Sequence, residues 1–130
     1  MPKCTDETVK FGRVGRRVVE AAFVGGDIVS DGGVLLLKQV DERLGLTRAA
    51  ALAFGDGRRS ASVQHSVREL LAQRIYGLCL GWSDVCDHNV LRHDLVMQTA
   101  VGSAEPLASA PTLSRLETGA TPEHAGALHA

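Results

Sequence analysis

The stretch SVRELLAQRIYGLCLGWSDVCDHNVLRHD, residues 66–94, decides the fold class. It opens with Ser66 and Glu69 in the S-x-x-E order of a helix capping box, in which each side chain satisfies a backbone N–H of the other residue. From Val67 on, apolar residues recur at the three- and four-residue spacing of one helical face, and Gly81 is placed to end the helix. The stretch therefore predicts a helix that begins at Val67 and packs one face into a core.

Ionisable side chains interrupt this apolar pattern. The guanidinium of Arg74 points into the apolar face, where an unpaired charge would be costly. On a second predicted helix, Asp84, Asp87 and His88 share one face at i, i+3 and i+4. We expect Arg74 to pair with one or two of the acids Asp84, Asp87 and Asp94. His88 would join the same structural ion-pair network through a hydrogen bond.

Metal binding is the alternative interpretation of these residues. The two aspartates and the histidine of the shared face have the spacing of cation ligands, but the charge of Arg74 would compete with the ion. A zinc site built from Cys79, Cys86, His88 and His93 is disfavoured, because C-x6-C-x-H-x4-H matches no common structural zinc pattern. We therefore predict no metal site and no cofactor for this chain.

The N-terminal part of the sequence has a strand pattern. Residues 16–30, RRVVEAAFVGGDIVS, supply β-branched and aromatic side chains on both sides of a glycine pair. Gly25 and Gly26 tolerate the positive φ angles of a two-residue hairpin turn. The segment is typical of a β-hairpin.

Capping residues mark further helices. The expected caps are Ser30 or Asp31 for a helix that ends at Gly45, Thr47 for the short helix after it, and Ser83 and Asp94 for two later helices. The sequence TLSRLE begins another helix. Residues 118–130 are rich in Ala, Gly, Thr and His without periodicity, and we expect them to be disordered. The predicted fold is mainly α: a small helical domain over 18–117 with an N-terminal β-hairpin.

Composition limits the classes of function. The 130 residues suit one domain, and 45% hydrophobic with 22% charged residues is typical of a globular protein. No apolar run approaches the ~18 residues of a membrane span. Three cysteines without framework spacing and no secretory signal favour reduced thiols in a cytoplasmic protein.

Charge is uneven along the chain. The formal net charge is -1, yet the arm over residues 1–17 carries five cations against two acids. Such an arm is suited to contact DNA phosphates, although a solvated tail is the commoner explanation. The candidate phosphate contacts, chosen for clustering and expected exposure, are Lys10, Arg13, Arg16, Arg17, Arg58 and Arg59.

The order of these motifs resembles the N-terminal region of bacterial insertion-sequence transposases of the thirteen-eighty group, which carry a DDE-type domain. The resemblance covers about residues 11–117 and rests on FxGGxIVSDGGVLLLKQVDERLGL, DxRR, the stretch from Gln64 to Asp94, AVG and APTLSRLE. It implies a function in DNA transposition, with binding to terminal inverted repeats. In that family three carboxylates of an RNase H-like core hold two divalent metal ions, most simply Mg²⁺.

The chain departs from the family pattern after Glu117. Thr118 stands where the family has Asn, and low-complexity sequence follows in place of the strand with the first catalytic carboxylate. We therefore expect a fragment without catalytic residues that neither cleaves nor joins DNA by itself. The alternative function is a protein-interaction piece that associates with intact transposase or with itself.

Overall fold

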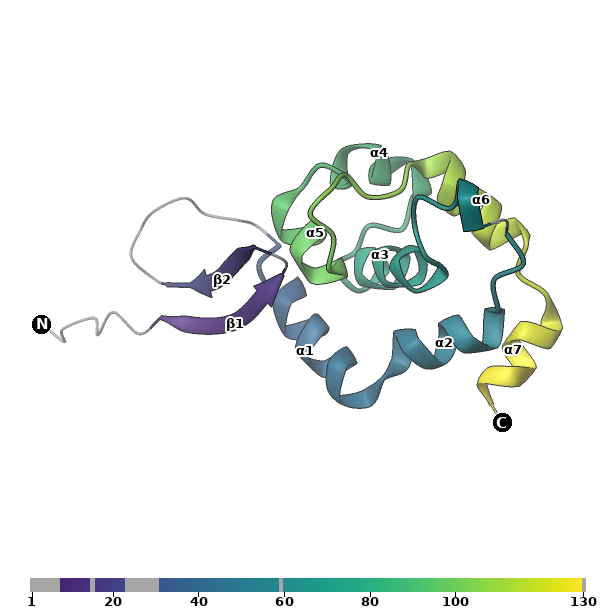
Figure 1. Ribbon diagram of the computed structural model, residues 1–130, viewed down its shortest axis with the longest axis horizontal. Helices are drawn as coiled ribbons and strands as arrows, with labels where there is room; N and C mark the ends of the chain where they lie inside the picture. The colour runs from purple at the N-terminus through teal and green to yellow at the C-terminus, as the bar shows by residue number, and fades with distance from the viewer. Residues whose placement is uncertain (1–7, 15, 23–30, 59, 130) are drawn as a thin grey trace, which may run out of the picture.

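The computed structural model describes residues 8–14, 16–22, 31–58 and 60–129 (Figure 1). In chain order the elements are β1 (Val9–Val14), β2 (Arg17–Ala21), α1 (Val34–Leu44), α2 (Leu46–Phe54), η1 (Ser60–Ser62), α3 (Val67–Cys79), η2 (Val85–Asp87), α4 (His88–Leu91), α5 (Leu95–Val101), α6 (Ala110–Thr118) and α7 (Pro122–Leu128). The predicted fold class is confirmed: a mainly α domain with a two-stranded antiparallel hairpin at its N-terminal end. Within the described residues, no helix has the length and apolar character that crossing a bilayer requires.

Helix α3 forms the centre of the helical body, with the other helices arranged around it (Figure 1). The capping box of Ser66 and Glu69 is present, and the helix begins at Val67 as predicted. Three groups of buried side chains surround α3. The largest contains Val34, Leu35, Ala72, Tyr76, Met97, Ala100, Val101 and Leu107, and the others are centred on Leu71 and on Leu113.

Helices α1 and α2 meet at a sharp corner. Gly45 takes φ 68°, a left-handed conformation that glycine adopts without strain, and its N–H caps α1 by donating to the Asp41 carbonyl. Thr47 was predicted to cap α2, but it lies inside the helix and is buried. Two other hydrogen bonds explain its position: its backbone N–H and its hydroxyl both donate to the Asp41 carboxylate.

The hairpin that the structure describes lies earlier in the sequence than the predicted turn. Strand β2 pairs with the preceding β1, and Val14 lies opposite Arg17. The predicted turn at Gly25 and Gly26 falls outside the described residues. The earlier pairing has an apolar reason, because Phe11 of β1 and Val19 of β2 both pack against the largest core cluster.

The helices between α3 and α5 are also shorter than predicted. Ser83 does not begin a helix; Asp84 caps the short η2 instead, because its carboxylate accepts the N–H of Cys86 at 2.8 Å. One turn of α-helix follows in α4. Asp94 then caps α5 as predicted by accepting the N–H of Met97 at 2.8 Å.

The segment after residue 117, for which composition predicts disorder, contains a further helix. Helix α7 begins after Thr121, which forms a reciprocal capping pair with His124, and Pro122 occupies the first turn. The helix is fixed to α2 by a stacked contact between the rings of His124 and Phe54, with centroids 4.7 Å apart. Composition alone predicts disorder here because the contact between Phe54 and His124 joins residues that are distant in sequence.

Candidate nucleic-acid interface

The exposed face of the hairpin gathers three of the six predicted phosphate contacts, Lys10, Arg13 and Arg16. Lys10 lies opposite Glu20 and Arg13 lies opposite Val18, and facing residues of an antiparallel pair project from the same side. Strict alternation would place Lys10 and Arg13 on opposite faces. The register shifts between Lys10 and Gly12, however, and this β-bulge brings both cations to the exposed side. Gly12 accommodates the bulge with φ 91°.

This exposed face, called the outer face below, carries Lys10, Arg13, Arg16 and Glu20 and is cationic. Lys10 approaches Glu20 at 3.9 Å, but the lysine side chain stays 76% exposed. Arg13 and the turn residue Arg16 are exposed, and neither has a hydrogen-bond or ion-pair partner among the described residues. With three cations and one carboxylate, the face has a net charge of +2. The two strands extend outward from the helical body, with their turn end nearest to it (Figure 1).

Arg17 has a different role from its three neighbours. It is half-buried, and its guanidinium donates to the Gln98 amide oxygen at 3.5 Å and to the Ala104 carbonyl at 3.2 Å. These bonds attach the hairpin to α5 and to the loop that follows it. The sequence-based choice of Arg17 as a phosphate contact is therefore not supported by its position, which is at the base of the hairpin.

The loop after α2 holds a second basic site. Arg58 makes two bonds to the Asp56 carboxylate, both of 2.8 Å, and a third to the His65 carbonyl at 2.9 Å. The bonds from Arg58 lower the pKa of Asp56 to about 2, and the same pair raises the pKa of Arg58. Arg58 is thus fixed and its charge is balanced. Arg59 lies outside the described residues.

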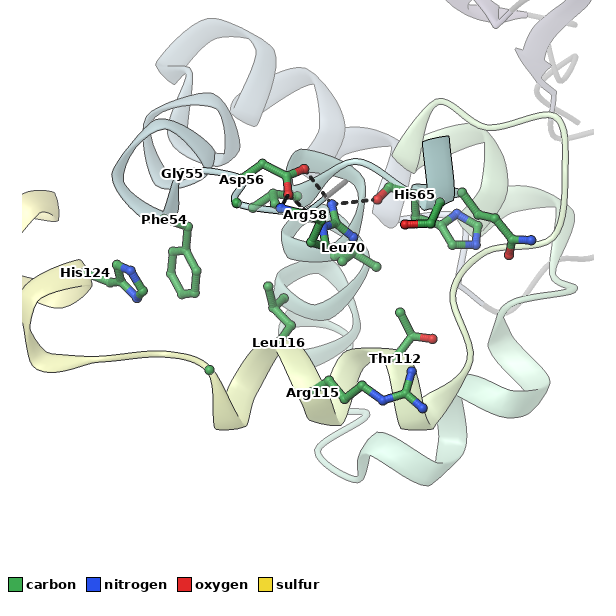
Figure 2. Close-up of a pocket in the computed structure, with 15 residues that line it drawn as sticks. Phe54, Gly55, Asp56, Arg58, His65, Leu70, Thr112, Arg115, Leu116 and His124 are labelled. Carbon is green, nitrogen blue, oxygen red and sulfur yellow. Dashed lines mark hydrogen bonds and ion pairs between the residues drawn. The ribbon is translucent and has the colours of Figure 1, made fainter. Parts of the chain in front are cut away.

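A pocket of about 490 Å³ opens beside this ion pair, between the loop, α6 and α7 (Figure 2). Phe54 and His124 stand at one end, Thr112 and Arg115 stand at the other, and Leu116 lies between them (Figure 2). The pocket therefore has an aromatic end and a cationic end.

Arg74 pairs with a different acid from those predicted. Its guanidinium forms an ion pair with Glu117 at the end of α6, and it donates to the carbonyls of Trp82 at 3.3 Å and Ser83 at 2.9 Å. The Glu117 side chain remains 44% exposed. Local spacing favoured Asp84 and Asp87, whereas the partner comes from a helix 43 residues away.

Asp84, Asp87 and His88 do not share one helix face, because η2 and α4 replace the single predicted helix. Asp84 is exposed and caps η2, while His88 is fully buried. His88 Nδ1 lies 3.3 Å from the Gln73 amide nitrogen, and the His88 Nε2 has no partner among the described residues. Burial, and secondarily the nearby charge of Arg74, lowers the pKa of His88. The residue belongs to the core.

The principal buried carboxylate was missed by sequence analysis. Asp41 is 6% exposed and accepts three bonds: from the Thr47 N–H at 2.8 Å, from its hydroxyl at 2.6 Å and from the Tyr76 hydroxyl at 2.7 Å. Burial alone would raise the pKa of Asp41, but the hydrogen bonds outweigh it and hold the pKa below its usual value. The only signal in the sequence was an acid at a helix end followed by a threonine beyond Gly45.

The described residues show no grouping of three His, Cys, Asp or Glu side chains able to hold a metal ion. The same residues do provide two cationic features, the exposed face of the hairpin and the Arg115 end of the pocket.

Comparison with known proteins agrees with a polynucleotide-related function. The family model described as transposase DDE domain group 1 matches residues 11–130 and so includes the hairpin from Phe11 on, the helical body and α7. No curated protein and no solved structure matches the chain. Since the matched residues span nearly the whole sequence, the chain belongs to the family of transposases with a group 1 DDE domain.

Proposed function

We propose that this chain binds the terminal inverted repeats of a bacterial insertion sequence of the thirteen-eighty group, and that the outer face of the hairpin makes the contact. The observation that carries the proposal is the bulge, which places Lys10 and Arg13 on one side next to Arg16. A two-stranded ribbon fits the major groove of B-DNA, and its cations replace the counterions of the phosphates. Because the chain belongs to a transposase family, DNA is the polyanion that we expect at this face.

The metal chemistry of the family does not enter this proposal. Two-metal phosphoryl transfer needs carboxylates that converge on two ions. In the ranges that the structure describes, the residues do not fit such a centre: Asp84 and Asp94 are used as helix caps, and Asp41 is saturated by three donors. The proposed function is therefore recognition of DNA.

Fluorescence anisotropy with a labelled terminal-repeat duplex tests the hairpin contact. The double variant Arg13→Ala/Arg16→Ala should weaken binding, and the slope of log affinity against log salt should fall by about 0.9 for each phosphate that the variant no longer neutralises. The matched control is Arg43→Ala/Arg48→Ala, which removes two exposed cations from α1 and α2 that have no partner among the described residues. Equal slopes for the two double variants would refute the hairpin contact.

A scrambled duplex of the same length separates general from specific binding. Phosphate contacts act on every sequence, whereas recognition of the terminal repeat requires tighter binding to the native duplex. The same affinity for both duplexes would limit the function to non-specific DNA binding.

A second candidate function is association with intact transposase or with another copy of the chain. Helix α1 supports it, because Leu36, Val40 and Leu44 recur every four residues and are 57%, 50% and 65% exposed. Such a stripe favours a protein partner. Light scattering after size exclusion, with Val40→Glu as the variant, tests self-association: a dimer that the variant converts to a monomer would support it.

A further inference from the structure

The pocket between α2, α6 and α7 has features that the hairpin contact does not use. Its volume of about 490 Å³ is much larger than a single phosphate needs. Its lining combines apolar side chains, among them Val67, Leu70 and Leu116, with polar and charged groups. A ligand that fills it has an apolar or planar body as well as a polar group.

The charge of the lining favours an anion. Asp56 is the acid of the pocket, and both of its carboxylate oxygens are bonded to Arg58. Arg115 contributes a second guanidinium, which has no hydrogen-bond or ion-pair partner among the described residues. The net charge of Asp56, Arg58 and Arg115 together is +1. The unbalanced charge is therefore at the Arg115 end, where a fork of N–H donors suits a phosphate.

The opposite end favours a planar ring. Phe54 and His124 stack with centroids 4.7 Å apart and ring planes 22° apart. The Nδ1 of His124 accepts the Thr121 N–H at 3.1 Å, so the neutral ring carries its proton on Nε2, where it can donate to a ligand. Leu116 supplies an apolar surface between the two ends (Figure 2).

From this arrangement we infer that the pocket binds one nucleotide unit of DNA, with its phosphate on Arg115 and its base toward the Phe54 and Leu116 side. The inference rests on the proposed DNA-binding function for the choice of a nucleotide over other anions with a planar group. A base in this position is not paired within a duplex, so the unit comes from a single strand, a strand end or an extrahelical base. The hairpin and the helices α6 and α7, which contribute to the pocket lining, lie at opposite ends of the molecule (Figure 1), so their contributions are separable.

Titration of the full chain with deoxyadenosine monophosphate, followed by amide NMR, tests the pocket directly. The amides of residues 55–58 and 112–116 should shift, while those of the hairpin should not. Deoxyadenosine and inorganic phosphate are titrated in parallel, and each should bind more weakly than the nucleotide. Equal binding of phosphate alone, equal binding of an acidic peptide such as acetyl-glutamate amide, or no shift at the pocket would overturn the inference.

A pair of arginine variants tests the phosphate contact. Arg115→Ala should weaken nucleotide binding about tenfold, since a hydrogen-bonded charge is removed. Arg115→Lys should lie between this variant and the unaltered chain, because it keeps the charge but not the fork. Arg48→Ala removes an exposed arginine of α2 outside the pocket lining and should bind normally. If Arg115→Ala, with an unchanged thermal melt, also bound normally, the proposed contact would be wrong.

Duplex probes separate this inference from the hairpin contact. A duplex with one bulged adenine should bind several-fold more tightly than its fully paired equivalent. Arg115→Ala should abolish this preference, whereas Arg13→Ala/Arg16→Ala should weaken both probes and retain the preference. Loss of the preference only in the hairpin variant would refute the pocket. A hairpin variant with unchanged affinity would instead refute the proposed function, and the nucleotide titration would still judge the pocket.

Discussion

Tyr76 and Arg74 lie two residues apart on α3, yet their polar contacts differ in burial. The Tyr76 hydroxyl donates to Asp41 inside the corner of α1 and α2, where both residues are buried. Arg74 meets Glu117 and two backbone carbonyls at an edge that water reaches. A hydrogen bond contributes little net stability when water can replace it, and its removal is costly when water cannot. The inner contacts should therefore hold the fold much more strongly than the outer ones.

The largest expected effect is at Asp41. Asp41→Ala leaves three buried donors of Thr47 and Tyr76 without an acceptor, and we expect a loss of roughly 3–5 kcal/mol in the free energy of unfolding. Urea denaturation followed by circular dichroism measures it. The comparison variant is Asp84→Ala, which removes one exposed cap bond and should cost about 1 kcal/mol. Similar losses for the two variants would contradict the distinction between buried and exposed contacts.

The next effect concerns the contact between Gly77 and His88. A Cβ built on Gly77 would lie 2.7 Å from the His88 Cε1, and the His88 ring is fully buried. Gly77→Ala should therefore destabilise by roughly 1–3 kcal/mol through overpacking, despite its better helix propensity. Gly126→Ala is the control, since a Cβ there meets nothing within 4 Å, and α7 should gain about 0.5–1 kcal/mol. A neutral Gly77→Ala would show that His88 can move.

Acidification provides a subtler test of the inner contacts. The folded pKa of His88 is lowered from 6.5, so the unfolded chain binds this proton first, and stability should decline as pH falls below 6.5. The folded pKa of Asp41 is lowered from 3.8, so its contribution is present above that value and disappears only at lower pH. Midpoints of urea denaturation, measured across this pH range, give the decline in stability. The His88 Cε1 proton, followed by NMR, should titrate below the usual histidine pKa of 6.5, and a midpoint at 6.5 would refute the burial of this ring.

The same contrast explains what could be predicted from sequence. The start of α3, the Asp94 cap and the end of α1 at Gly45 were correct, because caps and turns depend on residues a few positions apart. The pairing of β2 with β1 was not predicted, because its register depends on Phe11 and Val19 reaching a core that other elements build. The residues of β1 and β2 alone do not show this contact with the core.

The polar partners show the limit more sharply. Tyr76 and Asp41 are 35 residues apart, as are Gln73 and Ala108, whose amide and backbone groups bond in both directions. Helical periodicity places a residue on a face but does not identify what covers that face. The same limit applies to the candidate DNA contacts, since the sequence does not show which of them other elements cover. Arg13 and Arg16 are exposed, while Arg17 is bonded to α5 and the loop after it.

The smallest expected effect is the coupling between Arg74 and Glu117. Arg74→Ala also removes the bonds to the Trp82 and Ser83 carbonyls, so it should cost roughly 1–2 kcal/mol, whereas Glu117→Ala should cost less because its carboxylate is already 44% exposed. A double-mutant cycle isolates the pair itself, for which about 0.2–1 kcal/mol is expected of a solvent-accessible ion pair. Raising the salt concentration should reduce that coupling, because the charges are open to screening. A coupling above about 3 kcal/mol that salt does not change would be typical of a buried pair; it would place Arg74 with Asp41 among the contacts that hold the core.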